Sequence, residues 1–198
     1  MEDTAKAIVT IWGDSQTCDH HFLKEAFLEN YKSSWYFSAP SFDSQSGRKM
    51  NEDLVQSIHH DMNLKSGLDR IQIHIILVGT NSLTGKQYQD LLPFYRQILE
   101  HGFANCKVLL CGFLPRPKTD KKTKLRFSET SAKLKALSRE PQYANHAFYL
   151  AIQRLFTRYD SIDEDCFRDG VHLSKSGAQK LAYNIFDYLN LRKTWFQA

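Results

Sequence analysis

Short runs of β-branched residues alternate along this chain with longer segments that carry apolar residues at helical spacing. Residues 71–78 are nearly all Ile, Leu and Val, which is typical of a strand buried on both faces of a parallel sheet. Further strands are predicted at residues 7–12, 34–38, 108–113 and 147–156. Alternating strands and helices form right-handed βαβ units. The sequence therefore predicts an α/β fold with a five-stranded parallel sheet covered on both sides.

Five amphipathic segments are expected to cover this sheet. Their apolar residues recur at three- and four-residue intervals, as in Leu54, Val55, Ile58 and Met62. The predicted helices span residues 20–31, 51–64, 87–101, 128–137 and 174–189. Residues 41–49 are rich in Ser, Asp, Gln and Gly and are predicted to form a loop.

The composition is that of a globular protein. Hydrophobic residues make up 42% of the 198 residues and charged residues 24%, which excludes disordered, collagen-like, coiled-coil and mucin-like chains. We expect a single domain over residues 1–198, with a basic loop at residues 115–127. The longest apolar stretch, residues 75–78, is far shorter than the roughly 20 residues of a membrane-spanning helix, so no membrane span is expected.

The first residues and the cysteines predict an intracellular, cytoplasmic protein. The opening Met-Glu-Asp-Thr-Ala-Lys has no basic segment followed by an apolar one, so no signal peptide is read. Cys18, Cys106, Cys111 and Cys166 form no Cys-x-x-Cys pair and are expected to be reduced thiols. The histidine pairs, including the one near Cys18, fit no standard zinc spacing, so no metal site is expected.

Positive charge is concentrated in one segment. The formal net charge is +4, and residues 116–126 hold six basic side chains against one carboxylate, so the rest of the chain is close to neutral. Such a patch suggests a polyanionic partner such as nucleic acid, and a solvated surface loop is the alternative. The candidate polyanion-binding residues are Arg116, Lys118, Lys121, Lys122, Lys124 and Arg126.

Three polar clusters lie at or near the ends of predicted strands. Ligands of open parallel sheets bind beyond the carboxyl ends of the strands, so all three clusters are expected to face one crevice. Each cluster alone has a plainer explanation, as a surface turn, a turn after a strand, or a helix N-terminus. Their order and placement in one chain favour a shared site. The clusters are Gly13-Asp14-Ser15, Gly79-Thr80-Asn81 and Asp169-Gly170-Val171-His172.

These clusters supply the groups that a serine nucleophile needs. Serine requires a base within hydrogen-bond reach, and the base requires a group that fixes its tautomer. A spacing of three residues lets Asp169 reach Nδ1 of His172, which leaves Nε2 to accept a proton from Ser15. Candidate donors to an oxyanion are the backbone N–H of Ser15, the amide of Asn81 and the N–H of Gly47, the one glycine in residues 41–49.

With these motifs the sequence resembles the SGNH (GDSL-type) hydrolase superfamily over nearly its whole length. Gly-Asp-Ser matches the first family block, Gly-Thr-Asn the third, and Asp-Gly-Val-His the last. Two positions depart from the pattern: Gln16 stands where Leu usually follows the serine, and Ser82 where Asp usually follows the asparagine. The size and the basic segment are also similar to the esterase domain of LINE-type retrotransposon proteins and to the SGNH-like RNA-binding domain of Oskar.

The resemblance implies a three-layer α/β/α sandwich with a flavodoxin-like sheet, the SGNH hydrolase fold. It also implies a triad of Ser15, His172 and Asp169, with Ser15, Gly47 and Asn81 as oxyanion donors. The leading interpretation is a serine esterase that hydrolyses short-chain, acetyl-type esters without a cofactor. The alternative is an SGNH-fold module that binds RNA or another polyanion. Deacetylation of a carbohydrate is a third possibility that differs only in substrate.

Overall fold

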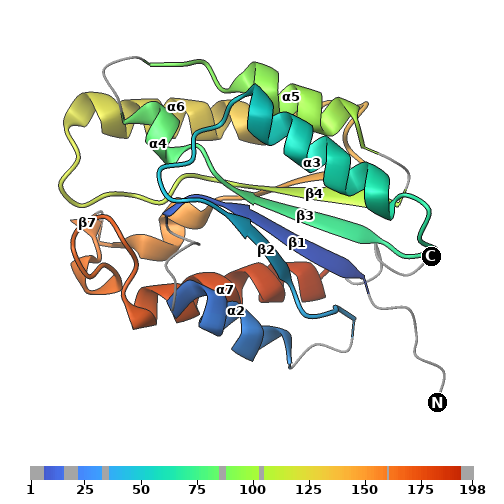
Figure 1. Cartoon of the computed structure of the whole chain (residues 1–198). Coiled ribbons are helices and arrows are strands. Elements are labelled where there is room, and N and C mark those ends of the chain that lie inside the picture. The colour runs from blue at the N-terminus through green and yellow to red at the C-terminus, as the bar shows by residue number, and fades with distance from the viewer. Residues whose placement is uncertain are drawn as a thin grey trace.

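A computed structural model describes residues 7–15, 22–32, 36–84, 88–102, 105–159 and 161–192. A five-stranded sheet forms its centre, and helices pack on both faces (Figure 1). The elements in chain order are β1 (Ile8–Gly13), α2 (Phe22–Tyr31), β2 (Ser41–Ser44), α3 (Glu52–Lys65), β3 (Gln72–Leu77), α4 (Thr80–Leu83), α5 (Leu92–Glu100), β4 (Cys106–Cys111), α6 (Lys121–Leu137), β5 (Ala147–Leu150), the 3₁₀ helix η1 (Ile152–Phe156), β6 (Thr157–Arg158), β7 (Ser161–Ile162), the 3₁₀ helix η2 (Glu164–Cys166) and α7 (Lys175–Asn190).

The five strands of the main sheet are parallel and lie in the order β2-β1-β3-β4-β5. This flavodoxin-like order confirms the predicted fold class. The strand order reverses between β1 and β3, because the chain passes first to β2 on one side of β1 and then to β3 on the other. Gly13 at the end of β1 pairs with Ser44 of β2 and Leu77 of β3, so these three strands end at one level.

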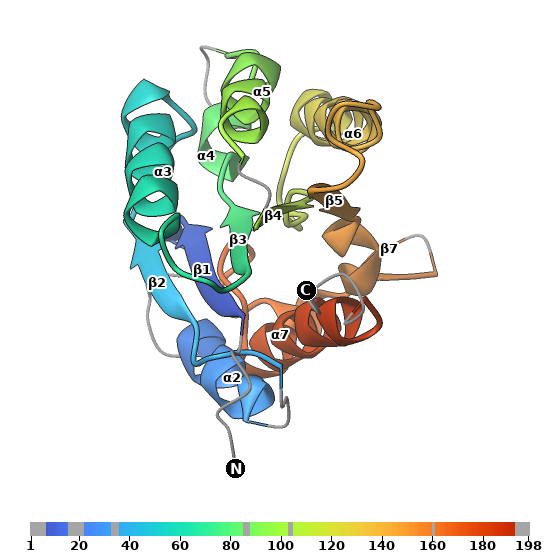
Figure 2. The same ribbon diagram turned by 90° about the vertical axis from the view of Figure 1, so that its right-hand side faces the viewer.

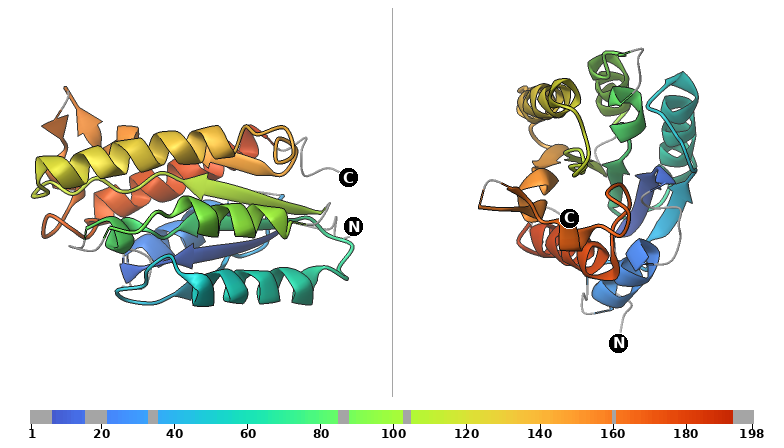
Figure 3. Two further views of the ribbon diagram at one scale, coloured as in Figure 1. Left: turned by 90° about the horizontal axis from the view of Figure 1, so that it is seen from above. Right: turned by 90° about the vertical axis from the view of Figure 1, so that its left-hand side faces the viewer.

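Two apolar layers hold the helices to the sheet. Helices α3, α5 and α6 lie over one face, and α2 and α7 lie over the other (Figures 2 and 3). In the fully buried strand β3, Ile76 faces the first layer with Ile58 of α3, whereas Ile75 faces the second with Ile185 of α7. This alternation follows from the two-residue repeat of a strand and confirms a strand buried on both faces, which runs from Gln72 to Leu77 where residues 71–78 were predicted.

The second strand is not where the sequence predicted it. A strand was expected at residues 34–38 and a loop at 41–49, but β2 is Ser41–Ser44. Before it, Phe37 forms only an isolated bridge with Ala7; residues 33–35 lie outside the described ranges. β2 is a polar edge strand with partly exposed side chains. Such a strand forms because its backbone pairs with β1 and because it lies beside a buried face of the sheet. Its own composition therefore gives little indication of a strand.

The basic segment 115–127 is not a loop throughout, because α6 begins inside it at Lys121. Asp120 caps this helix: its carboxylate accepts hydrogen bonds from the backbone N–H of Thr123 (3.0 Å) and from the Thr123 hydroxyl (2.8 Å). A cap of this kind starts a helix even where the following residues are basic and oppose the helix dipole. The predicted start at residue 128 is therefore wrong.

Other predicted boundaries also differ from the structure. β4 is Cys106–Cys111, two residues earlier than the predicted strand at 108–113. α5 begins at Leu92, later than the predicted residue 87, and carries a proline in its first turn, where its fixed φ suits a helix start. Residues 147–156 divide into β5 and η1 instead of forming one strand. Of the predicted thiols, Cys106, Cys111 and Cys166 are buried and form no disulfide, and Cys18 lies outside the described residues. None of the described helices has the length and apolar character needed to span a membrane.

Candidate active site

The loops that carry the predicted site residues leave the sheet at one edge, at the left in Figure 1. Asp14 and Ser15 follow β1, Gly47 follows β2, and Asn81 lies on α4 directly after β3. These positions flank the point between β1 and β3 at which the strand order reverses. In open α/β sheets this is where ligands bind.

Gly79 allows α4 to begin close to the end of β3. Its φ is +120°, and a Cβ at this position would lie 2.7 Å from Cε1 of Phe113 and 3.1 Å from the hydroxyl oxygen of Tyr95. The Tyr95 hydroxyl donates a hydrogen bond to the carbonyl of Val78 (2.6 Å), which fixes the end of the strand. A larger residue would therefore displace the turn that presents Asn81.

The side-chain amide of Asn81 connects three segments of the site. Its Nδ2 donates to Oδ2 of Asp14 (3.4 Å) and to the carbonyl of Arg48 (3.2 Å), and its Oδ1 accepts from Nη2 of Arg116 (3.0 Å). A guanidinium can only donate hydrogen bonds, so the Asn81 oxygen must face Arg116. The amide N–H groups are thereby directed towards Asp14, the neighbour of Ser15, and towards Arg48.

Asp14 is buried, and the guanidinium of Arg116 supplies positive charge near it. Burial lowers the pKa of Arg116, and the Asp14 carboxylate acts against that effect. From the sequence, Arg116 is predicted to belong to a polyanion-binding patch, and no role is predicted for Asp14. The sequence could have indicated a role in the site for both Asp14 and Arg116, because each follows a predicted strand at the end of the sheet that carries the site.

Ser82 replaces the aspartate of the family pattern and supports the site in another way. Its Oγ accepts a hydrogen bond from the backbone N–H of Met50 (3.0 Å), which precedes α3. The loop after β3 is thereby tied to the loop after β2. This departure from the pattern leaves the segment around Asn81 supported, whereas Gln16, the other departure, lies outside the described residues.

A second polar group lies in the loop before α7. Oδ2 of Asp169 is 2.7 Å from Nδ1 of His172, and Oδ1 accepts the backbone N–H groups of Val171 (2.9 Å) and His172 (2.7 Å). The loop is closed by a backbone hydrogen bond from the N–H of Arg168 to the carbonyl of His172 (2.9 Å). An ionised carboxylate can only accept, so Nδ1 carries a proton, and in the neutral imidazole this tautomer leaves the lone pair on Nε2 of His172.

The carboxylate of Asp169 is held in its charged form. Burial acts to raise the pKa of Asp169, but the hydrogen bonds from the backbone and ring of His172 and from the backbone of Val171 outweigh burial. The pKa of Asp169 therefore lies well below its usual range. Water still reaches the pair, because the Asp169 side chain is 45% exposed and that of His172 is 28% exposed.

The segment after β4 runs between Asn81, with its hydrogen-bond partners, and the Asp169–His172 loop. Arg116 contacts Asn81, and the side chain of Lys118 packs beside Gly170, where a Cβ would lie 3.6 Å from Cδ of Lys118. One short segment thus touches both the Asn81 group and the Asp169–His172 loop.

Ser15 is partly buried at the start of the loop after β1. Among the described residues, no hydrogen bond joins its hydroxyl to His172 or to any other side chain. The Ser15–His172 hydrogen bond of the predicted triad is thus not formed in this structure. Gly47 lies in a turn with φ +71°, next to Arg48, whose carbonyl binds Asn81. The role of Gly47 as an oxyanion donor stays a prediction.

The predicted polyanion-binding patch is divided by the fold. Arg116 is bound to Asn81, and Arg126 reaches the carbonyl of Leu83 (3.5 Å) and lies over the ring of Tyr88 (5.1 Å). The lysines at positions 121, 122 and 124 are exposed on the first turns of α6. Nucleic-acid binding by these lysines stays a prediction. In the described ranges no group of His, Cys, Asp and Glu side chains is arranged to hold a metal ion.

Comparison with solved structures gives the class of this fold. A member of the lipolytic protein G-D-S-L family from Veillonella parvula matches with a TM-score of 0.73 and 16% identity, over 93% of this chain and 98% of that one. The lipase/acylhydrolase from Enterococcus faecalis matches with a TM-score of 0.70 and 14% identity, over 94% and 96% of the two chains.

The C-terminal catalytic domain of peptidoglycan O-acetyltransferase A from Streptococcus pneumoniae has a TM-score of 0.66 and 13% identity, with 96% of each chain covered. No family model matches this sequence. No curated protein matches it either. The chain has the fold of the SGNH (GDSL-type) hydrolases, which confirms the resemblance seen in the sequence motifs at the level of the fold. The narrower resemblances to retrotransposon esterases and to Oskar stay predictions.

Proposed function

We propose that this protein is a GDSL-type serine hydrolase that cleaves short-chain acyl esters with Ser15, His172 and Asp169. The observation that carries the proposal is the 2.7 Å hydrogen bond between Asp169 and Nδ1 of His172. This bond selects the tautomer whose Nε2 can accept the proton of a serine. The similarity of the fold to acylhydrolase structures supports the proposal.

In the proposed reaction, Oγ of Ser15 attacks the acyl carbon while Nε2 of His172 accepts the hydroxyl proton. The carbonyl electrons move to oxygen, which gives a tetrahedral oxyanion. As this intermediate collapses, the bond to the alcohol oxygen breaks and His172 returns its proton to the departing alcohol. Water then attacks the acyl-serine by the same route, which releases the carboxylic acid and restores Ser15.

The hydrogen bond between Ser15 and His172 forms, in this proposal, when the substrate binds. Hydrogen bonds between catalytic groups are often long or unformed in a free enzyme and tighten in the substrate complex. The partial exposure of Asp169 and His172 fits a site that water still fills and that an ester would close.

We assign stabilisation of the oxyanion to the backbone N–H of Ser15, Nδ2 of Asn81 and the N–H of Gly47. Both hydrogens of the Asn81 amide have acceptors in the free protein. The longer bond, 3.4 Å to Asp14, is the one that an oxyanion replaces. Arg116 is a positioning residue, because its bond to Oδ1 prevents the amide from turning its oxygen towards the negative charge.

Hydrolysis of p-nitrophenyl acetate tests the nucleophile. We expect Ser15→Ala to lower kcat/KM by at least about 10³-fold, because triad residues act as a unit. Ser66→Ala is the matched control, since Ser66 caps the C-terminal end of α3, and this variant is expected to keep full activity. A serine-directed organophosphate should add one adduct to the wild type and none to Ser15→Ala. Equal rates for wild type and Ser15→Ala would remove Ser15 from the mechanism.

The pH dependence tests the base. Protonated His172 has no lone pair at Nε2, so kcat/KM is expected to fall as the pH is lowered. The pKa of Asp169 is held well below its usual range, so Asp169 stays ionised over the pH range in which this fall is measured. A single protonation then controls the low-pH part of the pH–rate profile. In that part, a plot of log kcat/KM against pH should have a slope of about one. A limb that involves two protons would contradict this assignment.

A further inference from the structure

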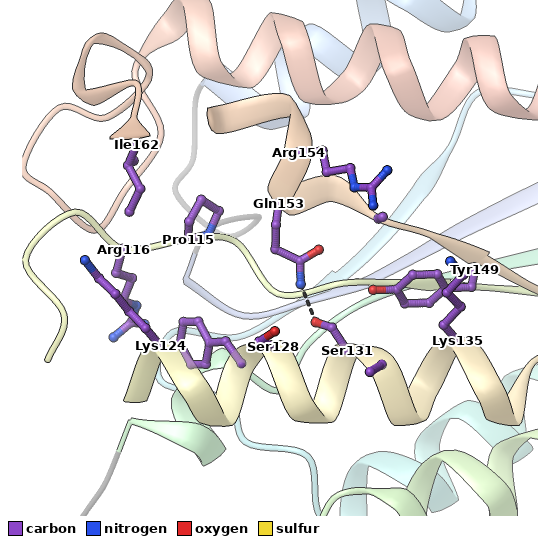
Figure 4. Close-up of a pocket in the computed structure, with 13 residues that line it drawn as sticks. Pro115, Arg116, Lys124, Ser128, Ser131, Lys135, Tyr149, Gln153, Arg154 and Ile162 are labelled. Carbon is purple, nitrogen blue, oxygen red and sulfur yellow. Dashed lines mark hydrogen bonds between the residues drawn. The ribbon is translucent and has the colours of Figure 1, made fainter. Parts of the chain in front are cut away.

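A cleft of about 380 Å³ lies between α6 and η1, next to the candidate active site (Figure 4). The segment after β4, one face of α6, the end of β5 and the start of η1 line it. Apolar surface comes from Phe127, Ala132, Ala151, Ile162 and the ring of Tyr149. A volume of this size lies within the range typical of small-molecule sites.

Four basic side chains and no carboxylate line this cleft: Arg116, Lys124, Lys135 and Arg154. In the described part of the chain, no carboxylate oxygen lies within 4.0 Å of their charged nitrogen atoms. Arg116 lies near the buried Asp14 carboxylate, whereas Lys124, Lys135 and Arg154 carry positive charge with no carboxylate partner among the described residues. Net positive charge in a concave and partly apolar site concentrates anions. The cleft therefore differs from the outer surface of α6, where acidic and basic side chains both meet open solvent.

The walls of the cleft are joined across its middle. Gln153 of η1 donates a hydrogen bond to Ser131 of α6, as Figure 4 shows. The side-chain amide of Gln153 also lies directly against Gly112, where an added Cβ would displace it. Arg116 and Lys124 lie on one side of this bond in Figure 4. The walls of the cleft are thus bridged by a hydrogen bond, and basic side chains lie on both sides of it.

We propose that this cleft binds a small organic phosphate monoester, with its phosphoryl group on the basic side chains and its flat apolar body on Phe127 and Tyr149. A phosphoryl group carries close to two negative charges and three acceptor oxygens, so it matches several cations better than a single carboxylate does. The Nε of Arg116 is buried and has no hydrogen-bond acceptor among the described residues. Binding at this cleft does not depend on the proposed hydrolysis.

Calorimetric titration of the full chain with phenyl phosphate, at fixed salt, tests the site. Inorganic phosphate lacks the apolar body and benzyl alcohol lacks the charge, so both serve as comparison ligands. We expect phenyl phosphate to bind at least about tenfold more tightly than either, since charged hydrogen bonds and apolar contact each contribute. Equal affinity for inorganic phosphate and phenyl phosphate would overturn the proposal, because the apolar part of the cleft would then play no role.

Two variants locate the ligand. The double variant Lys124→Gln, Arg154→Gln should weaken phenyl phosphate at least about tenfold, because charged hydrogen bonds are lost. The matched control is Lys122→Gln, Lys133→Gln, which removes the same charge from exposed positions on α6 outside the cleft and should leave the affinity within about twofold. If both pairs weaken binding equally, the effect is general electrostatics and the cleft is not the site.

Ala132→Phe provides a test that leaves the charge unchanged. Ala132 is an exposed helix residue that lines the cleft, so a phenyl group there should occupy the apolar part and abolish binding without loss of Tm. Unchanged affinity in this variant would contradict the proposal. A single-stranded oligonucleotide that binds more tightly than phenyl phosphate, and depends on Lys122 but not on Arg154, would instead identify a polyanion surface.

Discussion

The chemistry of the site rests on side chains that can only donate or only accept hydrogen bonds. Arg116 can only donate, and it therefore fixes which end of the Asn81 amide faces Asp14. The ionised Asp169 can only accept, and it therefore fixes the tautomer of His172. Each of these charged groups orients a neighbour that would otherwise have two equivalent states. Substitutions that keep the shape of such a group but reverse its polarity are therefore informative.

Asp169→Asn separates the two functions of this carboxylate. The amide keeps Oδ1, so the bonds from the backbone N–H groups of Val171 and His172 can persist, but an N–H group replaces Oδ2 opposite Nδ1 of His172. We expect kcat/KM to fall about 10²- to 10⁴-fold while Tm changes little, because the tautomer is lost and the loop is kept. Asp169→Ala should lower both kcat/KM and Tm. Full activity of Asp169→Asn would contradict the proposed role.

The burial of His74 predicts that the stability of the fold depends on pH, independently of catalysis. It is buried in β3, where Nδ1 accepts from Nε1 of Trp12 (3.1 Å) and Nε2 lies 3.3 Å from Oε1 of Gln72. Burial lowers the pKa of His74 from 6.5 to about 4, against the opposing effect of Asp61. The folded protein therefore holds this imidazole neutral at a pH at which the unfolded chain protonates it.

As the pH falls from about 6.5 to about 4, the unfolded state gains a proton that the folded state does not bind. The free energy of unfolding should therefore decrease by about 3 kcal/mol over this range. Below about pH 4 both states bind the proton, so His74 should cause no further decrease. Urea titrations of wild type and His74→Gln measure this difference, with the exposed His60→Gln as control. Parallel stability curves for wild type and His74→Gln would show that His74 does not contribute.

At the scale of elements, the starts of helices position the site. α7 begins directly after the Asp169–His172 loop, with Ser174 as its cap, whose Oγ accepts from the N–H of Gly177 (3.3 Å). The N–H of Ser174 donates to the carbonyl of Cys166 (2.9 Å), which ties the helix start to η2. The close approach of these two backbones holds the loop between them in one conformation.

Gly177→Ala tests this contact. In an open helix this change would stabilise by about 1 kcal/mol. Here a Cβ would lie 2.1 Å from the carbonyl oxygen of Cys166, so backbone must move and we expect a net destabilisation of about 1–3 kcal/mol together with lower activity. Gly67→Ala, where no atom lies within 4 Å of the added Cβ, is the matched control and should be neutral or slightly stabilising. Urea unfolding that gave the same result for both variants would contradict this account.

At the scale of the molecule, the two apolar layers share one sheet. Ile58 belongs to one layer and Ile185 to the other, yet both pack against strands of the same hydrogen-bonded ladder. Loss of either layer would expose a face of every central strand. We therefore propose that the described residues unfold as one cooperative unit, as expected for a single domain.

Ile58→Ala and Ile185→Ala test this proposal from opposite faces. Each should lower the stability by about 2–5 kcal/mol, because a buried side chain is lost and a cavity is left. In both variants, unfolding followed by circular dichroism and by fluorescence should give one coincident transition. A transition that splits in one variant and not in the other would show that the two layers unfold independently.

The sequence by itself determined the features that depend on local pattern. Continuous apolar runs defined β1, β3 and β4, because a strand covered on both faces can hold few polar residues. The three-residue spacing of Asp169 and His172 defined their pairing, because both belong to one loop. In each case the interacting groups are close in the chain, so their geometry follows from a few backbone angles.

The tertiary structure alone decided where β2 lies, what Arg116 binds and that a basic cleft forms beside η1. β2 is polar and becomes a strand only because the edge of β1 offers backbone partners. Arg116 meets Asn81, 35 residues away, only because parallel strands end at one edge of the sheet. These contacts join residues far apart in the chain, and their free energy comes from packing that no local pattern records.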